Sequence, residues 1–165
     1  MPGLRRAALI SLVLVGLCTT ARADQWDDLA ATFAAQEHAR IVSRNDSGGG
    51  VSIDIEHPLV TGKTALLVLD GKPAMLFAFA AGSPPSDEVF ALMARGGSLI
   101  TGGDTATVMT VLHDAYQAAL AGKEQSDSRF KGLRHGSASA PSGVLYVGCM
   151  IHPHNSGLNF MIIKK

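Results

Sequence analysis

Two apolar runs, residues 64–69 and 74–79, flank the tetrapeptide Asp70-Gly71-Lys72-Pro73, and this arrangement constrains the fold more than any other part of the chain. Asp-Gly between two strand-like runs is among the strongest signals of a β-hairpin. Just before it, apolar and polar residues alternate over 51–56, which is typical of a strand with one solvated face. The sequence therefore predicts strands joined by short turns, as in an antiparallel sheet.

Helical and strand-like patterns alternate along the rest of the chain. Apolar residues at helical spacing predict helices over 24–37, 86–95 and 113–121, the second of which ends at Gly96. Further strands are predicted at 39–43, 98–101, 105–112, 144–151 and 158–163. Residues 122–142 are polar and rich in Gly and Ser, which predicts a flexible loop. We expect one α+β domain: a mainly antiparallel β-sheet, as a sandwich or partly open barrel, with two to three short helices.

The first 23 residues have the layout of a secretory signal peptide. Arg5 and Arg6 precede an apolar run over 7–17, and Ala21-Arg22-Ala23 is the small-x-small pattern that precedes a cleavage site. The apolar run is shorter than the roughly 20 residues that span a bilayer. We expect cleavage after Ala23, which leaves residues 24–165 as a single domain in the periplasm or secreted, with no integral membrane anchor.

The composition of the exported part limits its partners and its covalent chemistry. Without the three arginines of residues 1–23, which contain no acidic residue, the 14 basic residues fall to 11 against 14 acidic ones. This mild acidity gives no reason to expect affinity for nucleic acid. Of the two cysteines, Cys18 leaves with the signal peptide and Cys149 remains, so an intramolecular disulfide is impossible.

The densest cluster of possible metal ligands lies near the C-terminus. Cys149, Met150, His152 and His154 fall within six residues, and sulfur with imidazole suits copper or zinc. The stretch resembles the copper loop of cupredoxins, although Asn155 stands where a methionine ligand is wanted. A strand also directs neighbouring side chains to opposite faces. A copper or zinc site at Cys149, His152 and His154 is therefore an alternative hypothesis.

Cys149 with His152 or His154 could also form a thiolate–imidazole pair. Nothing in the sequence supplies oxyanion donors or an orienting acid for that pair. We therefore expect a protein that is not an enzyme and that has no cofactor, unless copper or zinc binds.

Residues 51–121 are similar, in order and pattern, to the centre of the invasion-associated locus B family. The resemblance is carried by His57-Pro58, by the strand and turn over 67–73, by the helix over 87–95 and by the amphipathic segment over 112–121. It implies a small, exported, mostly β protein without a recognised active site, associated with host-cell entry. The chain differs from that family in lacking paired cysteines and in its C-terminal hairpin.

Together these features predict a non-enzymatic binding protein of the cell envelope, with a protein partner in the envelope or the host. Loops that a rigid sheet positions are where binding residues concentrate. We therefore expect the binding surface to be the turn with His152, His154 and Asn155, together with the loop over 122–142.

Overall fold

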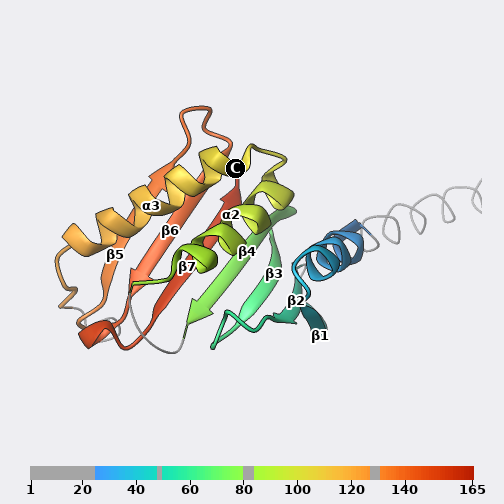
Figure 1. Cartoon of the computed structure of the whole chain (residues 1–165), viewed down its shortest axis with the longest axis horizontal. Helices are drawn as coiled ribbons and strands as arrows, with labels where there is room; N and C mark the ends of the chain where they lie inside the picture. The colour runs from blue at the N-terminus through green and yellow to red at the C-terminus, as the bar shows by residue number, and fades with distance from the viewer. Residues whose placement is uncertain (1–24, 48–49, 80–83, 127–130) are drawn as a thin grey trace, which may run out of the picture.

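The structure is a computed structural model that describes residues 25–47, 50–79, 84–126 and 131–165. These residues form seven strands in one antiparallel sheet, with the order β1-β2-β3-β4-β7-β6-β5. Residues 25–36 form an N-terminal helix, and two further helices lie across one face of the sheet (Figure 1). The elements are β1 (Arg40–Ser47), β2 (Gly50–Glu56), β3 (Thr64–Leu69), β4 (Lys72–Phe79), α2 (Asp87–Thr101), α3 (Thr105–Ala121), β5 (Arg134–Ser139), β6 (Leu145–Ile151) and β7 (Leu158–Lys164).

The predicted hairpins are confirmed. β3 and β4 pair in register from Thr64–Phe77 to Leu69–Lys72. Asp70 and Gly71 between them both have positive φ, 51° and 75°, as the tight turn of a two-residue hairpin requires. β6 and β7 form the closing hairpin, joined through the short 3₁₀ turn Pro153–Asn155.

The strands predicted at 98–101 and 105–112 are wrong, because both segments are helical. Residues 98–101 are the last turn of α2, which ends where Gly102 adopts φ 71° and donates its N–H to the carbonyl of Ser98. Residues 105–112 are the first half of α3, which begins where the Asp104 carboxylate accepts from the N–H of Thr107. Packing against the sheet and this cap outweigh the preference of a Thr- and Val-rich segment for strands.

Gly96, predicted as the end of a helix, lies inside α2. A Cβ on Gly96 would lie 3.0 Å from the ring of Phe33 and 3.2 Å from that of Phe77. The glycine therefore allows α2 to approach the N-terminal helix and the sheet closely, which is a packing role that a local pattern does not reveal.

The flexible loop predicted over 122–142 is wrong for Arg134–Ser139, which form β5; residues 127–130 lie outside the described part of the chain. Gly136 and Ala140 are buried under the helical layer and alternate with exposed residues. Because the buried positions, Gly136 and Ala140, carry little or no side chain, large apolar residues do not mark this alternation in the sequence.

The α+β class and the mainly antiparallel sheet are confirmed. The sheet forms a single open layer rather than a sandwich or a barrel, and helices cover one of its faces. Residues from that face and from the helices build one hydrophobic core, whose largest fully buried side chains include Phe33, Phe77, Phe160 and Leu112. None of the described helices is long and apolar enough to cross a bilayer.

Candidate binding surface

The described helices all lie on one face of the sheet, and none of them covers the other face (Figure 1). Side chains alternate between the two faces along each strand. Leu66, Met75, Ile162 and Val147 align across β3, β4, β7 and β6 on the helix-covered face, and each is at most 1 % exposed. The residues between them project from the opposite face, which we call the open face.

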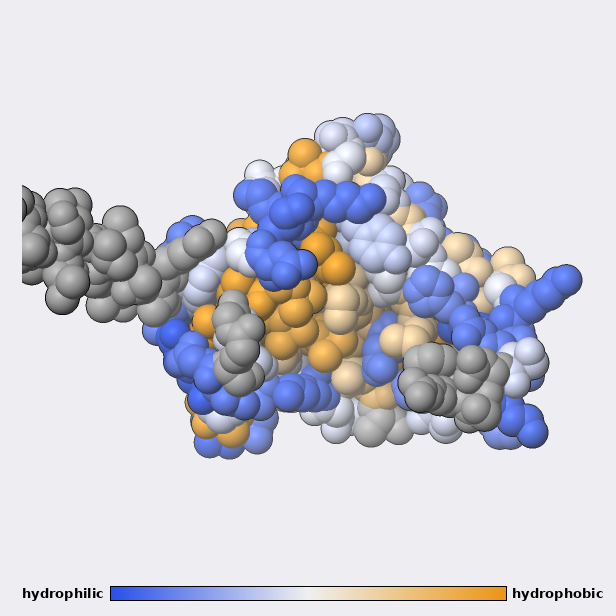
Figure 2. All heavy atoms as spheres, turned by 180° about the vertical axis from the view of Figure 1, so that it is seen from behind, coloured by the Kyte–Doolittle hydropathy of each residue, from blue (hydrophilic) through white to orange (hydrophobic). Residues whose placement is uncertain are grey.

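Large apolar side chains occupy the middle of the open face. Leu76 is paired with Met161, and Ile163 with Tyr146, so these side chains form a contiguous cluster across three strands. All four are half-buried, whereas Leu69 is 44 % exposed and Met150 36 %. Figure 2, which shows the molecule from behind, has hydrophobic atoms gathered across the middle of this face. We call the following residues the apolar strip: Leu67, Leu69, Leu76, Tyr146, Met150, Met161 and Ile163.

Polar strands border the apolar strip on both sides. On one side Asp54 of β2 accepts from the hydroxyl of Ser43 at 3.0 Å and pairs with the Lys63 ammonium at 2.8 Å. The hydrogen bond from Lys63 holds the pKa of the Asp54 carboxyl below its ordinary value. On the other side, β5 presents the exposed side chains of His135, Ser137 and Ser139. An apolar surface with a polar rim is typical of an interaction site.

One end of the open face is basic. Lys72 is paired with Leu69 at the start of β4, and Lys165 follows β7 with its Nζ 5.2 Å from the centre of the Tyr146 ring. With Lys164 they border a hollow of about 490 Å³, whose walls also include Trp26. Within the described part of the chain, none of the three lysines forms an ion pair.

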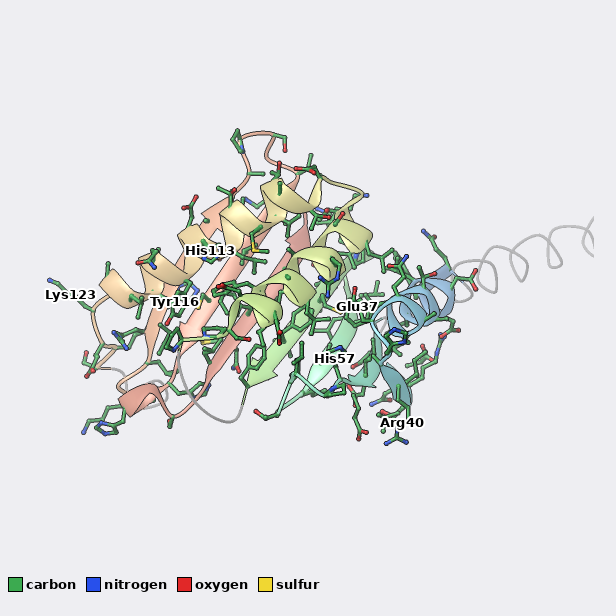
Figure 3. The ribbon with its side chains drawn as sticks, viewed as in Figure 1. Glu37, Arg40, His57, His113, Tyr116 and Lys123 are labelled. Carbon is green, nitrogen blue, oxygen red and sulfur yellow. The ribbon has the colours of Figure 1, made fainter. Side chains whose placement is uncertain are left out.

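A second hollow, of about 530 Å³, lies between the start of β1, the end of β2 and the loop over 57–62, and His57 is one of its walls. Nε2 of His57 lies 3.0 Å from the carbonyl oxygen of Glu37, and Nδ1 accepts from the N–H of Leu59 at 3.1 Å. Because Nδ1 accepts, Nε2 carries the proton and donates. Nε2 therefore joins His57 to Glu37 after the N-terminal helix, and Nδ1 holds the turn that follows β2. His57, which Figure 3 labels beside Glu37, has a structural role here.

The carboxylate of Glu37 links the end of the N-terminal helix to α2. Arg95 donates to both its oxygens, from Nε at 2.6 Å and from Nη2 at 2.7 Å. The Glu37 side chain is 7 % exposed and that of Arg95 is 48 % exposed. These hydrogen bonds raise the pKa of the Arg95 guanidinium above its already high ordinary value. The pair anchors the N-terminal helix on α2.

Cys149, the central residue of the metal and thiol hypotheses, points into the core. It is 1 % exposed and lies on the helix-covered face, paired with Phe160 and Gly136. Burial raises the pKa of its thiol to about 12, so the thiol is protonated at neutral pH. A reactive thiolate needs the opposite environment, exposed and positively charged.

The two histidines of the predicted binding turn lie beyond the end of β6. His152 is half-buried, and His154 is exposed with a φ of 57°; the side chain of Asn155 lies outside the description. Among the described residues, no three His, Cys, Asp or Glu side chains are grouped so that they could hold a metal ion. The copper or zinc site stays a prediction, as does binding through this turn.

Turn signals and alternation did not predict the open face, although two apolar runs of the sequence indicate it. The runs over 64–69 and 74–79 are apolar at nearly every position rather than at every second one. Such runs indicate strands that are apolar on both faces.

Ionisation of Cys149 predicts a loss of stability in alkali. The folded pKa of about 12 exceeds the ordinary value of 9.0, so the stability is complete below pH 9 and is lost as the pH rises toward 12. We expect the free energy of unfolding to fall by about 1.4 kcal/mol per pH unit within that window. Urea titrations of the wild type and of Cys149→Ala above pH 9 measure it, because the variant lacks this slope. Equal slopes in the two proteins would contradict the prediction.

No protein-family model matches the chain, and the comparisons with curated proteins and with solved structures also give no match.

Proposed function

We propose that the chain is an exported, non-enzymatic binding protein of the cell envelope, and that it binds a protein partner on the open face of its sheet. The observation that carries the proposal is the apolar strip, which spans four strands between two polar borders. Its side chains are aliphatic, thioether and phenol groups. Such groups bind a partner mainly by burial of apolar surface.

The charges around the strip favour a partner with carboxylates. Lys72 and Lys165 stand at one end of the strip, and within the described residues neither forms an ion pair with this chain. A partner surface with apolar side chains at its centre and acidic side chains beside these lysines complements both features. The similarity to the invasion-associated locus B family supports a partner on a host cell. The signal-peptide layout of residues 1–23 supports a location in the periplasm or outside the cell.

Site-specific photo-crosslinking tests the proposal, both in the periplasm and with host cells exposed to the purified protein. A photoreactive amino acid at Leu69 or Met150, the most exposed positions of the strip, is expected to give the same crosslinked protein. At Gln117, which is exposed on α3, it is expected to give none. The double variant Lys72→Glu, Lys165→Glu is expected to abolish the crosslink. Crosslinks of equal yield from Gln117, or none from the strip, would refute binding through the open face.

The mass of the exported protein tests its location. We expect protein recovered from the periplasm or the medium to begin at Asp24, as cleavage after Ala23 requires. A mass that includes residues 1–23 would contradict export by a cleaved signal peptide.

A further inference from the structure

The outer edge of β5 presents unpaired backbone groups. β5 is the last strand of the sheet, and in the part of the chain that the structure describes no strand pairs with its outer side. The N–H of Ala140 donates to the carbonyl of Leu145 at 3.0 Å, and the same register continues along β5 and β6. Because hydrogen bonding alternates along an antiparallel pair, Gly136 and Ala138 bond to β6. Ser137 and Ser139 therefore direct their N–H and C=O groups outward.

The opposite edge of the sheet is protected against strand addition. β1 contains an irregularity in register between Ile41 and Ser43, and it carries charged side chains at Arg40, Arg44 and Asp46. Bulges and charges are the usual devices that block pairing at an exposed edge.

β5 carries one charged side chain, Arg134, at its start, and lacks these devices over residues 136–139. Its six residues pair with β6 without any irregularity, and residues 136–139 are Gly, Ser, Ala and Ser, with no charge and no proline. An edge segment that is regular, neutral and made of small residues, as residues 136–139 are, is a template for another strand.

The position of α3 decides which kind of strand can be added. A Cβ on Gly136 would lie 2.5 Å from the backbone carbon of Ala118 and 2.6 Å from the carbonyl oxygen of Ala115, so the backbone of α3 lies directly over β5. If β5 paired antiparallel with β5 of a second copy, both α3 helices would lie on the same face of the joined sheet, separated by about the strand spacing of 5 Å. Packed helices need roughly 8–10 Å between their axes. An added strand must therefore carry no helix above it.

We propose that β5 binds an extended segment of another protein as an eighth strand of the sheet, through the backbone groups of Ser137 and Ser139. Main-chain hydrogen bonds would hold the segment, and every second side chain of it would extend the open face beside Ser137. The proposal uses the backbone of β5 and not the apolar strip, so a refutation of the proposed function would not refute it.

The test selects linear peptides of about ten residues from a random library on the wild-type protein and measures their affinity for two variants. Ser137→Pro removes the outward N–H without removing a hydrogen bond to β6, and is expected to weaken binding at least about tenfold. Ser137→Thr keeps the N–H and is expected to bind like the wild type. The peptides are also expected to slow hydrogen exchange at the amides of Ser137 and Ser139, and to bind Leu76→Glu normally.

Each other outcome overturns the proposal. Peptides that bind Ser137→Pro as tightly as the wild type, or a library that yields none, would show that the edge is not a binding site. A wild-type dimer that Ser137→Pro dissociates would show that a second copy occupies the edge. If Ser137→Pro fails to fold by circular dichroism, Ser139→Pro makes the same comparison at the other outward amide.

Discussion

Replacement of Gly136 by alanine is expected to cause a large loss of stability for a single added methyl group. The new Cβ would lie closest to the backbone nitrogen of Ala119, which it would overlap, and 2.5–2.6 Å from backbone atoms of Ala118 and Ala115 in α3. Backbone atoms of a helix cannot rotate away as the end of a side chain can, so α3 must shift off β5. Overpacking of a core usually costs about 1–3 kcal/mol, and we expect about 3 kcal/mol or more here.

Thermal and urea unfolding of Gly136→Ala measure this loss, which corresponds to a fall in Tm of about 10 °C. Gly148→Ala is the matched control on the neighbouring strand. Its Cβ would lie 3.5 Å from the Tyr146 ring, an ordinary van der Waals distance, and the φ of Gly148 is not positive. We expect Gly148→Ala to change the free energy of unfolding by less than about 1 kcal/mol. Equal losses in both variants would contradict the position of α3 over β5.

Loss of Arg95 is expected to destabilise the protein more than loss of its partner Glu37. Arg95→Met leaves the carboxylate of Glu37, 7 % exposed, without the two hydrogen bonds at 2.6 and 2.7 Å. Breaking a fully buried pair in this way costs about 3–5 kcal/mol. Because the Arg95 side chain is half-exposed, water reaches the vacated site, and we expect about 2–3 kcal/mol.

The asymmetry between the two partners is the test. In Glu37→Gln the amide oxygen still accepts from Arg95, whose charge is half-solvated, so we expect a loss of about 1 kcal/mol. The double variant Arg95→Met, Glu37→Leu removes the unpaired charge and is expected to be more stable than Arg95→Met alone. Urea unfolding of the three variants measures these differences. A larger loss for Glu37→Gln than for Arg95→Met would contradict this account of the pair.

Parts of the candidate site could be read from local patterns and parts could not. The turn at Asp70-Gly71 and the closing hairpin depend on residues next to one another in the chain, so both were predicted. Cys149 was correctly placed on a strand, but whether it faced solvent or the helices could not be known without the position of α3. The apolar strip collects side chains from four strands whose spatial order, β3-β4-β7-β6, is not their order in the sequence.

The sequence by itself determined the α+β class, the antiparallel pairing and the two hairpins, because turn residues and the alternation of side chains act over a few positions. Only the tertiary structure decided that residues 98–101 and 105–112 are helical, that Arg134–Ser139 pair at the edge of the sheet, and which face the helices cover. The physical reason is that these outcomes depend on contacts between distant segments. Gly136 under α3 and Gly96 against Phe33 are such contacts, and their energies outweigh local propensity.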